Sequence, residues 1–563
     1  MSSELAVTTV ARGVRSEHDS AMLGLMQDVP LTTNWILGRG EQYFATKTVT
    51  TRTASGIEHM TFAELAAGAR SLAGAIDGLG LAPDARVGTF AWNTAKHLQL
   101  YFAIPGTGRI LHTGNLRYSP DQFVYTANHA EDEAFFVDRS LLPLFAKYLS
   151  SVPTVKHVVV MDDGVPAEVP DDPRIVQWDD LIGAAGEVDF SDRVSDERQA
   201  AAMCYTTGTT GKPKGVLYSH RSTWLHSLAS MSSAVFSIHE RDKILPVVPM
   251  FHANAWGIPY TAVLSGASLV MPGPDLSPQA IVSLLESEKV TIAAGVPTIW
   301  MAMVPLLDVR DLSSLRTIIC GGSAVPKALS EAWRAKIGLP ITQAWGMTEL
   351  SPLGSVCFLR SEYDELSEDE RADIRATAGV AAPGVEVRIV DPDTRVPLPW
   401  DDKSAGELEC RGPWIAKQYY RTDEPGEQYT PDGWLRTGDV AAISQLGYIR
   451  LVDRTKDLVK SGGEWISTVE LENEIMAHPK VAEAAVIAVR HPKWMERPLA
   501  CVVVKPGEQL DKADVLDFLR DKFTPWQMPD DVVFIDEVPK TSVGKFSKKT
   551  LRDQFAEYVL PTA

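Results

Sequence analysis

Cysteines are few in this sequence, and no two of them are close neighbours. Five occur among 563 residues, without a CxxC pair, so neither a disulfide framework nor a zinc site is indicated. Basic residues are outnumbered by acidic ones, 54 against 73, and the net charge of -19 argues against broad binding to nucleic acid or anionic membranes. No apolar run approaches the ~18 residues of a membrane-spanning helix, and charges interrupt the short apolar stretch near residue 1. We therefore expect a cytoplasmic protein without a signal peptide or an integral membrane segment.

Hydrophobic periodicity in the first part of the chain predicts an α/β architecture. The stretch "TFAELAAGARSLAGAIDGLG" (61–80) begins with a Thr61/Glu64 capping box and keeps helical spacing up to its glycine stop. Short apolar runs such as "RVGTFAWN", "HVVVMD" and "TIICGGSAVP" are typical of buried strands that end in turns. The alternation predicts doubly wound sheets, which bind ligands at the carboxyl ends of their strands.

Two changes of pattern divide the rest of the chain. After about Thr377, short strands and tight turns such as "VEVRIVDPDTRVPLP" predict a small β-rich subdomain. Beyond "LVDRTKD" come a helix capped by Ser467 and Glu470 and the strand patterns "AAVIAV" and "ACVVVKPG". The expected fold is α/β: a large N-terminal domain (1–453) of doubly wound α/β subdomains and a small β-rich subdomain, then a small mobile α+β C-terminal domain (454–563).

The loop "YTTGTTGKPKGV" (205–216) has the composition of a phosphate site. Glycines let the backbone approach an anion, while amide groups, threonine hydroxyls and lysine ammonium groups donate hydrogen bonds to it. A P-loop is excluded, because Gly208 and Gly211 are too close together and Pro213 stands where a magnesium-binding hydroxyl should be. A protein kinase is excluded because no HRD and DFG pair accompanies the loop.

Four further motifs follow the loop in order. They are "QAWGMTE" (343–349), "GWLRTGD" (433–439), "DRTKDLVKSGGEWIS" (453–467) and "PKTSVGKFSKK" (539–549). Together with the loop, they make nearly the whole sequence resemble the acyl-adenylate-forming superfamily of acyl-CoA synthetases, luciferases and peptide-synthetase adenylation domains. The stretches "PMFHANAWGIPY", "KSGGEWIS" and "HPKWMERP" resemble its fatty-acyl-CoA ligase branch. The resemblance implies a carboxylate that attacks ATP to give acyl-AMP and pyrophosphate, and CoA whose thiol then displaces AMP.

The resemblance assigns most motif residues to the nucleotide. The loop would hold the β- and γ-phosphates, Glu349 would ligate Mg2+, and Thr348 would lie near the α-phosphate. Trp345, where many relatives have tyrosine, would stack on adenine, and Asp439 would accept hydrogen bonds from the ribose with help from Arg454. The residues implied to bind ATP or AMP are Thr206, Thr207, Gly208, Thr209, Thr210, Gly211, Lys212, Lys214, Gly322, Ser323, Ala344, Trp345, Gly346, Met347, Asp439 and Arg454.

The resemblance also implies that the C-terminal domain serves both half-reactions. Lys545 would catalyse adenylation, because its ammonium group can bridge the carboxylate and the α-phosphate, two anions that repel each other. It must leave before the thiol arrives, so the domain would rotate about Lys456. The turn with Gly462, Gly463 and Trp465 would then enter and line a tunnel for the pantetheine of CoA.

The acid is expected to bind beside "PMFHANAW". His252 lies where relatives place a residue next to the acyl carboxylate and the thiol path, which implies a catalytic role. Trp256 matches a tryptophan that gates the acyl tunnel in the long-chain branch, although a core role is the alternative. Together with Val296 and Gly322 it would line a pocket that is predicted to be apolar, because these stretches offer no evident charged partner for an amino group or a second carboxylate.

Four functions remain open after these observations. The first is an acyl-CoA ligase for medium- to long-chain fatty acids. The second is the same chemistry on a short or substituted acid, such as methylmercaptopropionate or an aryl acid, and the third is transfer of the acyl group to a carrier protein. The fourth, a non-catalytic binding protein, is disfavoured by intact Lys545, Glu349 and Asp439. Because "MLGLMQDVPLTTNWIL" resembles the dimer-forming segment of long-chain relatives, we also expect a homodimer, which light scattering would test.

Overall fold

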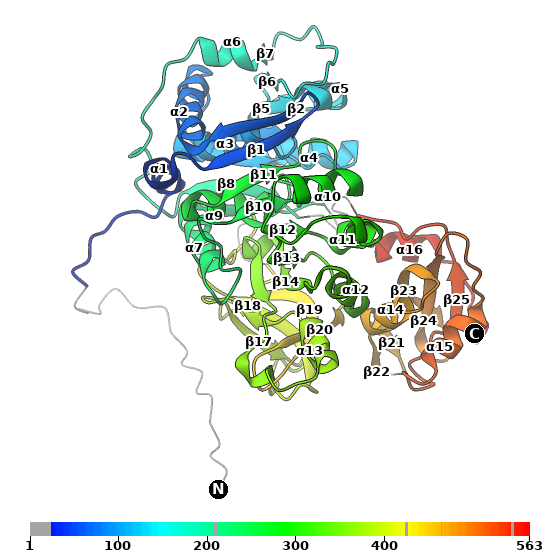
Figure 1. Cartoon of the computed structure of the whole chain (residues 1–563). Coiled ribbons are helices and arrows are strands. Elements are labelled where there is room, and N and C mark those ends of the chain that lie inside the picture. The colour runs from blue at the N-terminus through cyan, green and yellow to red at the C-terminus, as the bar shows by residue number, and fades with distance from the viewer. Residues whose placement is uncertain (1–23, 207–211, 423–425, 463, 542–544) are drawn as a thin grey trace.

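The structure is a computed structural model that describes residues 24–206, 212–422, 426–462, 464–541 and 545–563. Two large sheets with helices between and around them form most of the N-terminal part, and a small antiparallel sheet adjoins them (Figure 1). The last part of the chain forms a separate sheet with its own helices, beside the rest. The α/β fold class expected from the sequence is confirmed.

The first large sheet has seven strands in the order β7-β6-β5-β3-β4-β8-β9, and all neighbours are parallel except β8 and β9. Its strands are β3 (Arg86–Phe90), β4 (Ile110–Thr113), β5 (Asp132–Asp138), β6 (His157–Met161), β7 (Ile175–Gln177), β8 (Ala200–Tyr205) and β9 (Gly215–Ser219). The Gly/Thr/Lys-rich loop connects the antiparallel strands β8 and β9, so these two strands at the edge of the sheet hold the ends of the predicted phosphate motif.

The second large sheet has nine strands in the order β16-β15-β14-β13-β12-β10-β11-β1-β2 and is parallel from β14 to β1. Its strands are β1 (Thr48–Thr53), β2 (Gly56–Thr61), β10 (Lys243–Pro246), β11 (Ser268–Met271), β12 (Ile292–Gly295), β13 (Thr317–Cys320), β14 (Thr342–Gly346), β15 (Leu353–Val356) and β16 (Val380–Ala381). The carboxyl ends of β13 and β14 carry the "GGSA" and "GMTE" turns, where open α/β sheets bind ligands.

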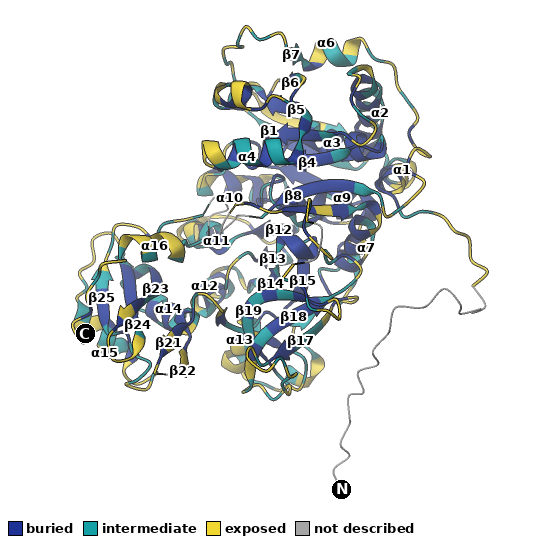
Figure 2. Ribbon diagram, turned by 180° about the vertical axis from the view of Figure 1, so that it is seen from behind, coloured by how far each residue is buried: buried dark blue, intermediate teal, exposed yellow. Residues whose placement is uncertain are grey.

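Helices bury the apolar faces of both sheets (Figure 2). The predicted capping box of α2 is confirmed: Thr61 Oγ1 accepts a hydrogen bond from the Glu64 amide, and the Glu64 carboxylate accepts one from the Thr61 amide. The N-terminal helices are α1 (Thr33–Phe44), α2 (Phe62–Gly78), α3 (Ala95–Gly106), α4 (Pro120–Ala130), α5 (Leu142–Phe145), α6 (Trp178–Gly183), α7 (His220–Met231), α8 (Ala253–Trp256), α9 (Ile258–Ser265), α10 (Pro278–Ser287), α11 (Pro297–Met303), α12 (Lys327–Ile337) and α13 (Glu368–Arg375). Among the residues described, no helix is both long and apolar enough to span a membrane.

The remaining sheets also agree with the sequence pattern. The predicted β-rich subdomain is an antiparallel sheet of β17 (Glu386–Val390), β18 (Ala405–Arg411), β19 (Leu435–Ile443) and β20 (Ile449–Arg454). The C-terminal sheet contains β21 (Val459–Ser461), β22 (Glu464–Ile466), β23 (Val481–His491), β24 (Met495–Val504) and β25 (Asp531–Phe534). It is covered by α14 (Thr468–Met476), α15 (Lys512–Leu519) and α16 (Lys548–Gln554), and it has its own apolar cores.

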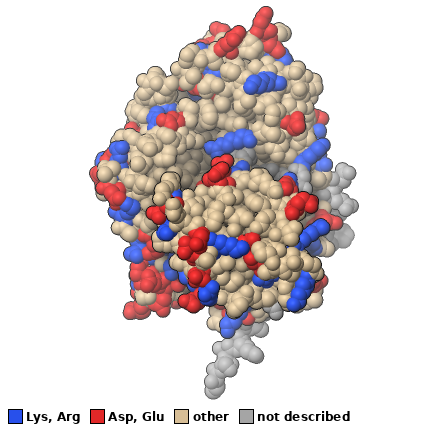
Figure 3. Space-filling view, turned by 90° about the vertical axis from the view of Figure 1, so that its right-hand side faces the viewer, with Lys and Arg blue, Asp and Glu red and all other residues tan. Residues whose placement is uncertain are grey.

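The face that includes the C-terminal part of the chain carries acidic and basic side chains interspersed over a largely uncharged surface (Figure 3). A hollow is visible on this face, with both basic and acidic side chains at its rim (Figure 3). Mixed charge around a hollow suits a small anionic ligand better than an extended polyanion.

Candidate active site

One cavity of about 920 Å³ collects most of the motif residues. Its walls come from the ends of β13 and β14, from β19 and β20 of the β-rich subdomain, and from the segment before α16. The predicted site residues that line it are Thr206, Lys212, Lys214, His252, Trp256, Gly322, Ser323, Ala344, Trp345, Gly346, Met347, Thr348, Glu349, Asp439, Arg454, Lys456 and Lys545. Thr207, Gly208, Thr209, Thr210, Gly211 and Gly463 lie outside the described residues.

The stem of the phosphate-type loop is held at both ends. The Thr206 amide donates to the Lys214 carbonyl over 2.9 Å, and the Lys214 amide donates to Thr206 Oγ1 over 3.1 Å. The Tyr118 hydroxyl donates to the Thr206 carbonyl at 2.8 Å. Lys214 Nζ lies 4.6 Å from the ring centre of Tyr419, a cation–π contact that keeps the ammonium group beside the cavity.

The "GMTE" turn presents one buried carboxylate. Glu349 is 5% exposed, and the Tyr419 hydroxyl donates to its Oε1 over 2.5 Å. The Tyr218 hydroxyl donates to the Thr348 carbonyl over 2.7 Å, which fixes the preceding residue. Sequence reasoning missed both tyrosines, because neither stands within four residues of the motif they support.

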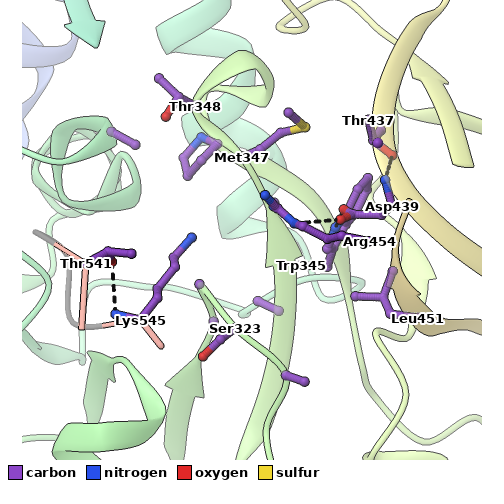
Figure 4. Close-up of a pocket in the computed structure, with 18 of the residues that line it drawn as sticks. Ser323, Trp345, Met347, Thr348, Thr437, Asp439, Leu451, Arg454, Thr541 and Lys545 are labelled. Atoms are coloured by element: carbon purple, nitrogen blue, oxygen red, sulfur yellow. Dashed lines mark hydrogen bonds and ion pairs between the residues drawn. The ribbon is translucent and has the colours of Figure 1, made fainter. Parts of the chain in front are cut away.

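Trp345 and Asp439 form a direct pair in the wall of the cavity (Figure 4). The indole Nε1 of Trp345 donates to Asp439 Oδ2 over 2.8 Å, and Arg454 Nε lies 3.1 Å from Asp439 Oδ1. The Thr437 hydroxyl accepts a hydrogen bond from the Asp439 amide at 3.1 Å. A tyrosine at this position has no indole N–H, so this hydrogen bond depends on tryptophan.

Trp256 is the last residue of a left-handed turn that begins directly after His252. The four residues of α8 all have positive φ, between 43° and 59°, a conformation that non-glycine residues rarely adopt. His252 precedes the turn, and burial, with the positive charges of Lys545 and Arg117, lowers its pKa to about 3. The imidazole of His252 is therefore neutral at physiological pH.

Lys545 extends from the C-terminal domain into the cavity, toward the turn with Ser323 (Figure 4). A Cβ atom on Gly322, whose φ is +87°, would lie 3.2 Å from Lys545 Cε, so the absence of a side chain leaves room for the lysine. Burial and then the charge of Arg454 lower the pKa of Lys545 to about 8, against the opposing effects of Asp439 and Glu349.

The two described residues predicted to bind CoA, Gly462 and Trp465, do not line this cavity. Trp465 is 43% exposed on the C-terminal domain, and the Gly462 amide donates to the Trp494 carbonyl over 2.9 Å. Lys456 follows β20 and lines the cavity, while Asp457 pairs with Arg552 of α16 at 2.6 Å. The arrangement brings Lys545 into the cavity and leaves the Gly462 turn outside it.

The far end of the cavity is less apolar than the sequence predicts. Aliphatic and aromatic side chains are joined there by polar ones on α7, α9 and α11, which are His226, Ser230, Thr261 and Thr298. The prediction omitted α7, which follows the phosphate-type loop, because the helix itself carries no recognisable pattern. Val296 packs near Gly322, 3.4 Å from the position of its Cβ, and the cavity is lined instead by the residues after it, Pro297, Thr298 and Met301.

Comparison with known proteins gives consistent results. Residues 41–420 match the AMP-binding enzyme family, and residues 470–545 match the AMP-binding enzyme C-terminal domain. The chain is 43% identical over 539 residues to 3-methylmercaptopropionyl-CoA ligase of Ruegeria lacuscaerulensis, with 95% of this chain and 99% of the relative covered. It is 44% identical over 550 residues to long-chain-fatty-acid–CoA ligase of Thermus thermophilus, with 97% and 99% covered. The crystal structure of ATP-bound MatB from Rhodopseudomonas palustris superposes with a TM-score of 0.80 at 27% identity, covering 93% of this chain and 99% of that one.

Proposed function

The chain belongs to the AMP-binding enzyme family and is an AMP-forming acyl-CoA ligase, and we propose that it activates an aliphatic carboxylic acid in the cavity that Lys545 enters. The single observation that carries this proposal is the convergence of Lys545, Glu349 and Asp439, from three separate parts of the chain, on one cavity. A protein that only bound a nucleotide would need no lysine that reaches into the cavity from the C-terminal domain.

The proposed roles at the nucleotide follow from the contacts. Trp345 and Gly322 flank the adenine, and Asp439, held by the indole and by Arg454, accepts the ribose hydroxyls. Thr206, Lys212 and Lys214 hold the phosphates together with the remaining residues of the loop.

Glu349 fits a magnesium site. Its buried carboxylate supplies a hard oxygen ligand, and magnesium usually takes only one or two protein carboxylates besides phosphate oxygens and water. Tyr419 engages one of the two carboxylate oxygens and so holds the group in place. When bound there, Mg2+ would neutralise phosphate charge as pyrophosphate forms.

Lys545 serves adenylation in this proposal. Its ammonium group draws the carboxylate and the α-phosphate together, and it offsets the negative charge that develops as they react. His252, being neutral, faces the carboxylate without adding a second positive charge.

The pH dependence of adenylation follows from the lowered pKa of Lys545. The reactive form is the ammonium ion, and the free-enzyme pKa is about 8, so kcat/KM for pyrophosphate release should fall as pH rises through about 8. Bound ATP and acid are anions that stabilise the ammonium ion, so the fall in kcat should occur at higher pH. A Lys545→Arg variant should lose this descending limb, because arginine stays protonated. A wild-type kcat/KM that stays flat through this range would contradict the assignment.

The second half-reaction requires a different arrangement of the domains. We place the boundary at residues 453 and 454, so that Lys456 is the hinge and the Gly462 turn, with Gly463 and Trp465, enters the cavity after Lys545 leaves. CoA is the acceptor in both close relatives, which favours it over a carrier protein.

The apolar side chains of Leu25, Met26 and Trp35, exposed by 95%, 84% and 53%, support the proposed homodimer.

The acid has two candidates. A medium- to long-chain fatty acid is favoured by the aliphatic part of the wall, which includes Ile238, Ile258 and Met301, and by the Thermus relative. A short or substituted acid is favoured by the polar residues of the same wall and by the Ruegeria relative. An aryl acid is the weaker form of this second candidate, since no flat slot between aromatic rings is evident among the lining residues.

The test of this function is AMP and pyrophosphate release with ATP, magnesium and CoA. A panel would run from propanoate through octanoate to hexadecanoate, with 3-(methylthio)propanoate and benzoate beside them. A kcat/KM that rises with chain length would identify a fatty-acyl-CoA ligase, and a maximum at the short acids would favour the second candidate. No turnover with any acid would refute the proposal that an aliphatic acid is the substrate.

A further inference from the structure

The wall of the cavity includes an imidazole whose Nε2 atom has no hydrogen-bond partner among the described residues. His226 lies in α7, is 2% exposed and lines the cavity. Its Nε2 atom is shielded from solvent and has no partner among the described residues. Buried polar atoms are nearly always paired, so an unpaired one on a cavity wall points to a group that the cavity receives.

A series of contacts leads from Lys545 past Trp256 to His226. A Cβ atom on Gly322 would lie 3.2 Å from Lys545 Cε, and one on the preceding Gly321 would lie 3.3 Å from the Trp256 indole. Gly257, the residue after Trp256, packs against His226, because its Cβ would lie 2.7 Å from the imidazole Nδ1. The order of these contacts places the imidazole along the acyl chain and away from the carboxylate.

The other polar groups near His226 already donate their protons. The Ser230 hydroxyl donates to the His226 carbonyl at 3.0 Å, and the Thr261 hydroxyl donates to the Gly257 carbonyl at 3.0 Å. The edge of the ring also packs against Trp414, with 6.2 Å between ring centres. Among the described residues at this end of the wall, the His226 imidazole keeps unused hydrogen-bonding capacity.

The imidazole is uncharged in this position. Burial lowers the pKa of His226 to about 4, so the ring is neutral at physiological pH and carries one N–H donor and one acceptor nitrogen. A neutral ring does not select a second carboxylate by charge. It is suited to an uncharged ether, thioether, hydroxyl or carbonyl group.

We propose that His226 determines which acid this ligase prefers, by hydrogen bonding to an uncharged oxygen or sulfur atom in the acyl chain. The inference rests on the proposed function. It concerns which atoms the acyl chain contains, whereas the length of the acyl chain is set by the depth of the cavity. An unsubstituted alkyl chain offers the imidazole no hydrogen-bond partner and leaves Nε2 unpaired. The loss of one such hydrogen bond corresponds to about tenfold in kcat/KM.

The experiment compares matched acids in one enzyme. Acids with a sulfur or oxygen atom in place of a single methylene, moved stepwise along the chain, are paired with the alkanoate of equal length, beginning with 3-(methylthio)propanoate and pentanoate. The measurement is the ratio of kcat/KM within each pair, which is independent of the fraction of enzyme that is folded. We expect the wild-type ratio to reach about tenfold at one position of the heteroatom. In His226→Leu we expect this ratio to fall to about one, because leucine offers no hydrogen bond.

Two further variants separate hydrogen bonding from shape. His226→Gln keeps a donor and an acceptor and should retain part of the preference. His220→Leu removes another buried imidazole of α7 that does not line the cavity and should leave the ratio unchanged.

A wild-type ratio of about one at every position, an unchanged ratio in His226→Leu, or a glutamine variant as indifferent as leucine would each overturn the proposal. In each of these three outcomes the enzyme still turns over the acids, so the proposed function stands. If the proposed function itself fails, no acid is turned over.

Discussion

Replacing Lys545 by alanine is expected to lower acyl-AMP formation by at least about a hundredfold, the usual result of removing one preorganised charge from a transition state. Its ammonium group is the cation that the C-terminal domain brings to the turn with Gly322 and Ser323. Without it, the carboxylate and the α-phosphate repel each other in a cavity that screens charge poorly. Pyrophosphate release with ATP and the acid, in the absence of CoA, measures this step.

The same variant should keep most of its activity in the second half-reaction. When synthetic acyl-AMP and CoA are supplied, Lys545 is no longer needed, so acyl-CoA should form at a rate near that of the wild type. Lys540→Ala is the matched control, because Lys540 belongs to the same lysine-rich segment but pairs with Glu483 at 2.9 Å and does not line the cavity. Equal losses in both half-reactions, or a comparable loss in Lys540→Ala, would contradict the role of Lys545.

The parts of the site that the sequence predicts are those carried by short, ordered motifs. Glu349 follows β14, Lys545 precedes α16 and Asp439 lies within β19, and each belongs to a short motif that keeps its residues together whatever the rest of the chain does. The alternation of apolar runs and capped helices likewise predicted the two large sheets, because strand and helix periods depend on local sequence alone. The fold class, and the gathering of these motif residues at one cavity, were therefore within reach of the sequence.

The contacts that support the site were not within reach, because they join distant parts of the chain. Tyr419 meets Glu349 across 70 residues, and Trp345 meets Asp439 across 94. Hydrophobic periodicity is a local signal and does not detect contacts between residues so far apart in sequence. Only the packed fold brings these residues together. The left-handed turn of α8 is unpredictable for another reason, since four consecutive non-glycine residues with positive φ oppose their own local preference.

The polar wall of the acyl end shows the same limit. His226 stands in a helix whose residues are polar and apolar on all sides, so its sequence does not tell which face meets a cavity. The prediction of an apolar pocket considered only stretches next to recognisable motifs, and α7 contains none. The proposed determinant of substrate preference therefore lies among the residues that the sequence reveals least.

Replacing Lys456 by proline is expected to have the opposite effect to the loss of Lys545. The structure holds Lys545 in the cavity and Gly462 outside its lining, which is the arrangement that we propose for adenylation. Reaching the other arrangement requires backbone rotation near Lys456, and a proline ring restricts φ to about -65°. If the second orientation then costs ~3 kcal/mol more, acyl-CoA formation from acyl-AMP falls about a hundredfold, while pyrophosphate release in the first step persists.

Lys456→Ala separates backbone restriction from loss of the side chain. Alanine removes the ammonium group but keeps φ free, so it should retain much more of the second half-reaction than proline. If alanine and proline lower that half-reaction equally, the side chain of Lys456 contributes to the chemistry and the hinge lies elsewhere. If proline lowers both half-reactions equally, the two steps share one arrangement of the domains, and the Gly462 turn must reach CoA without rotation. Only a selective loss with proline, largely absent with alanine, is consistent with a C-terminal domain that turns about this residue to exchange Lys545 for the CoA-binding turn.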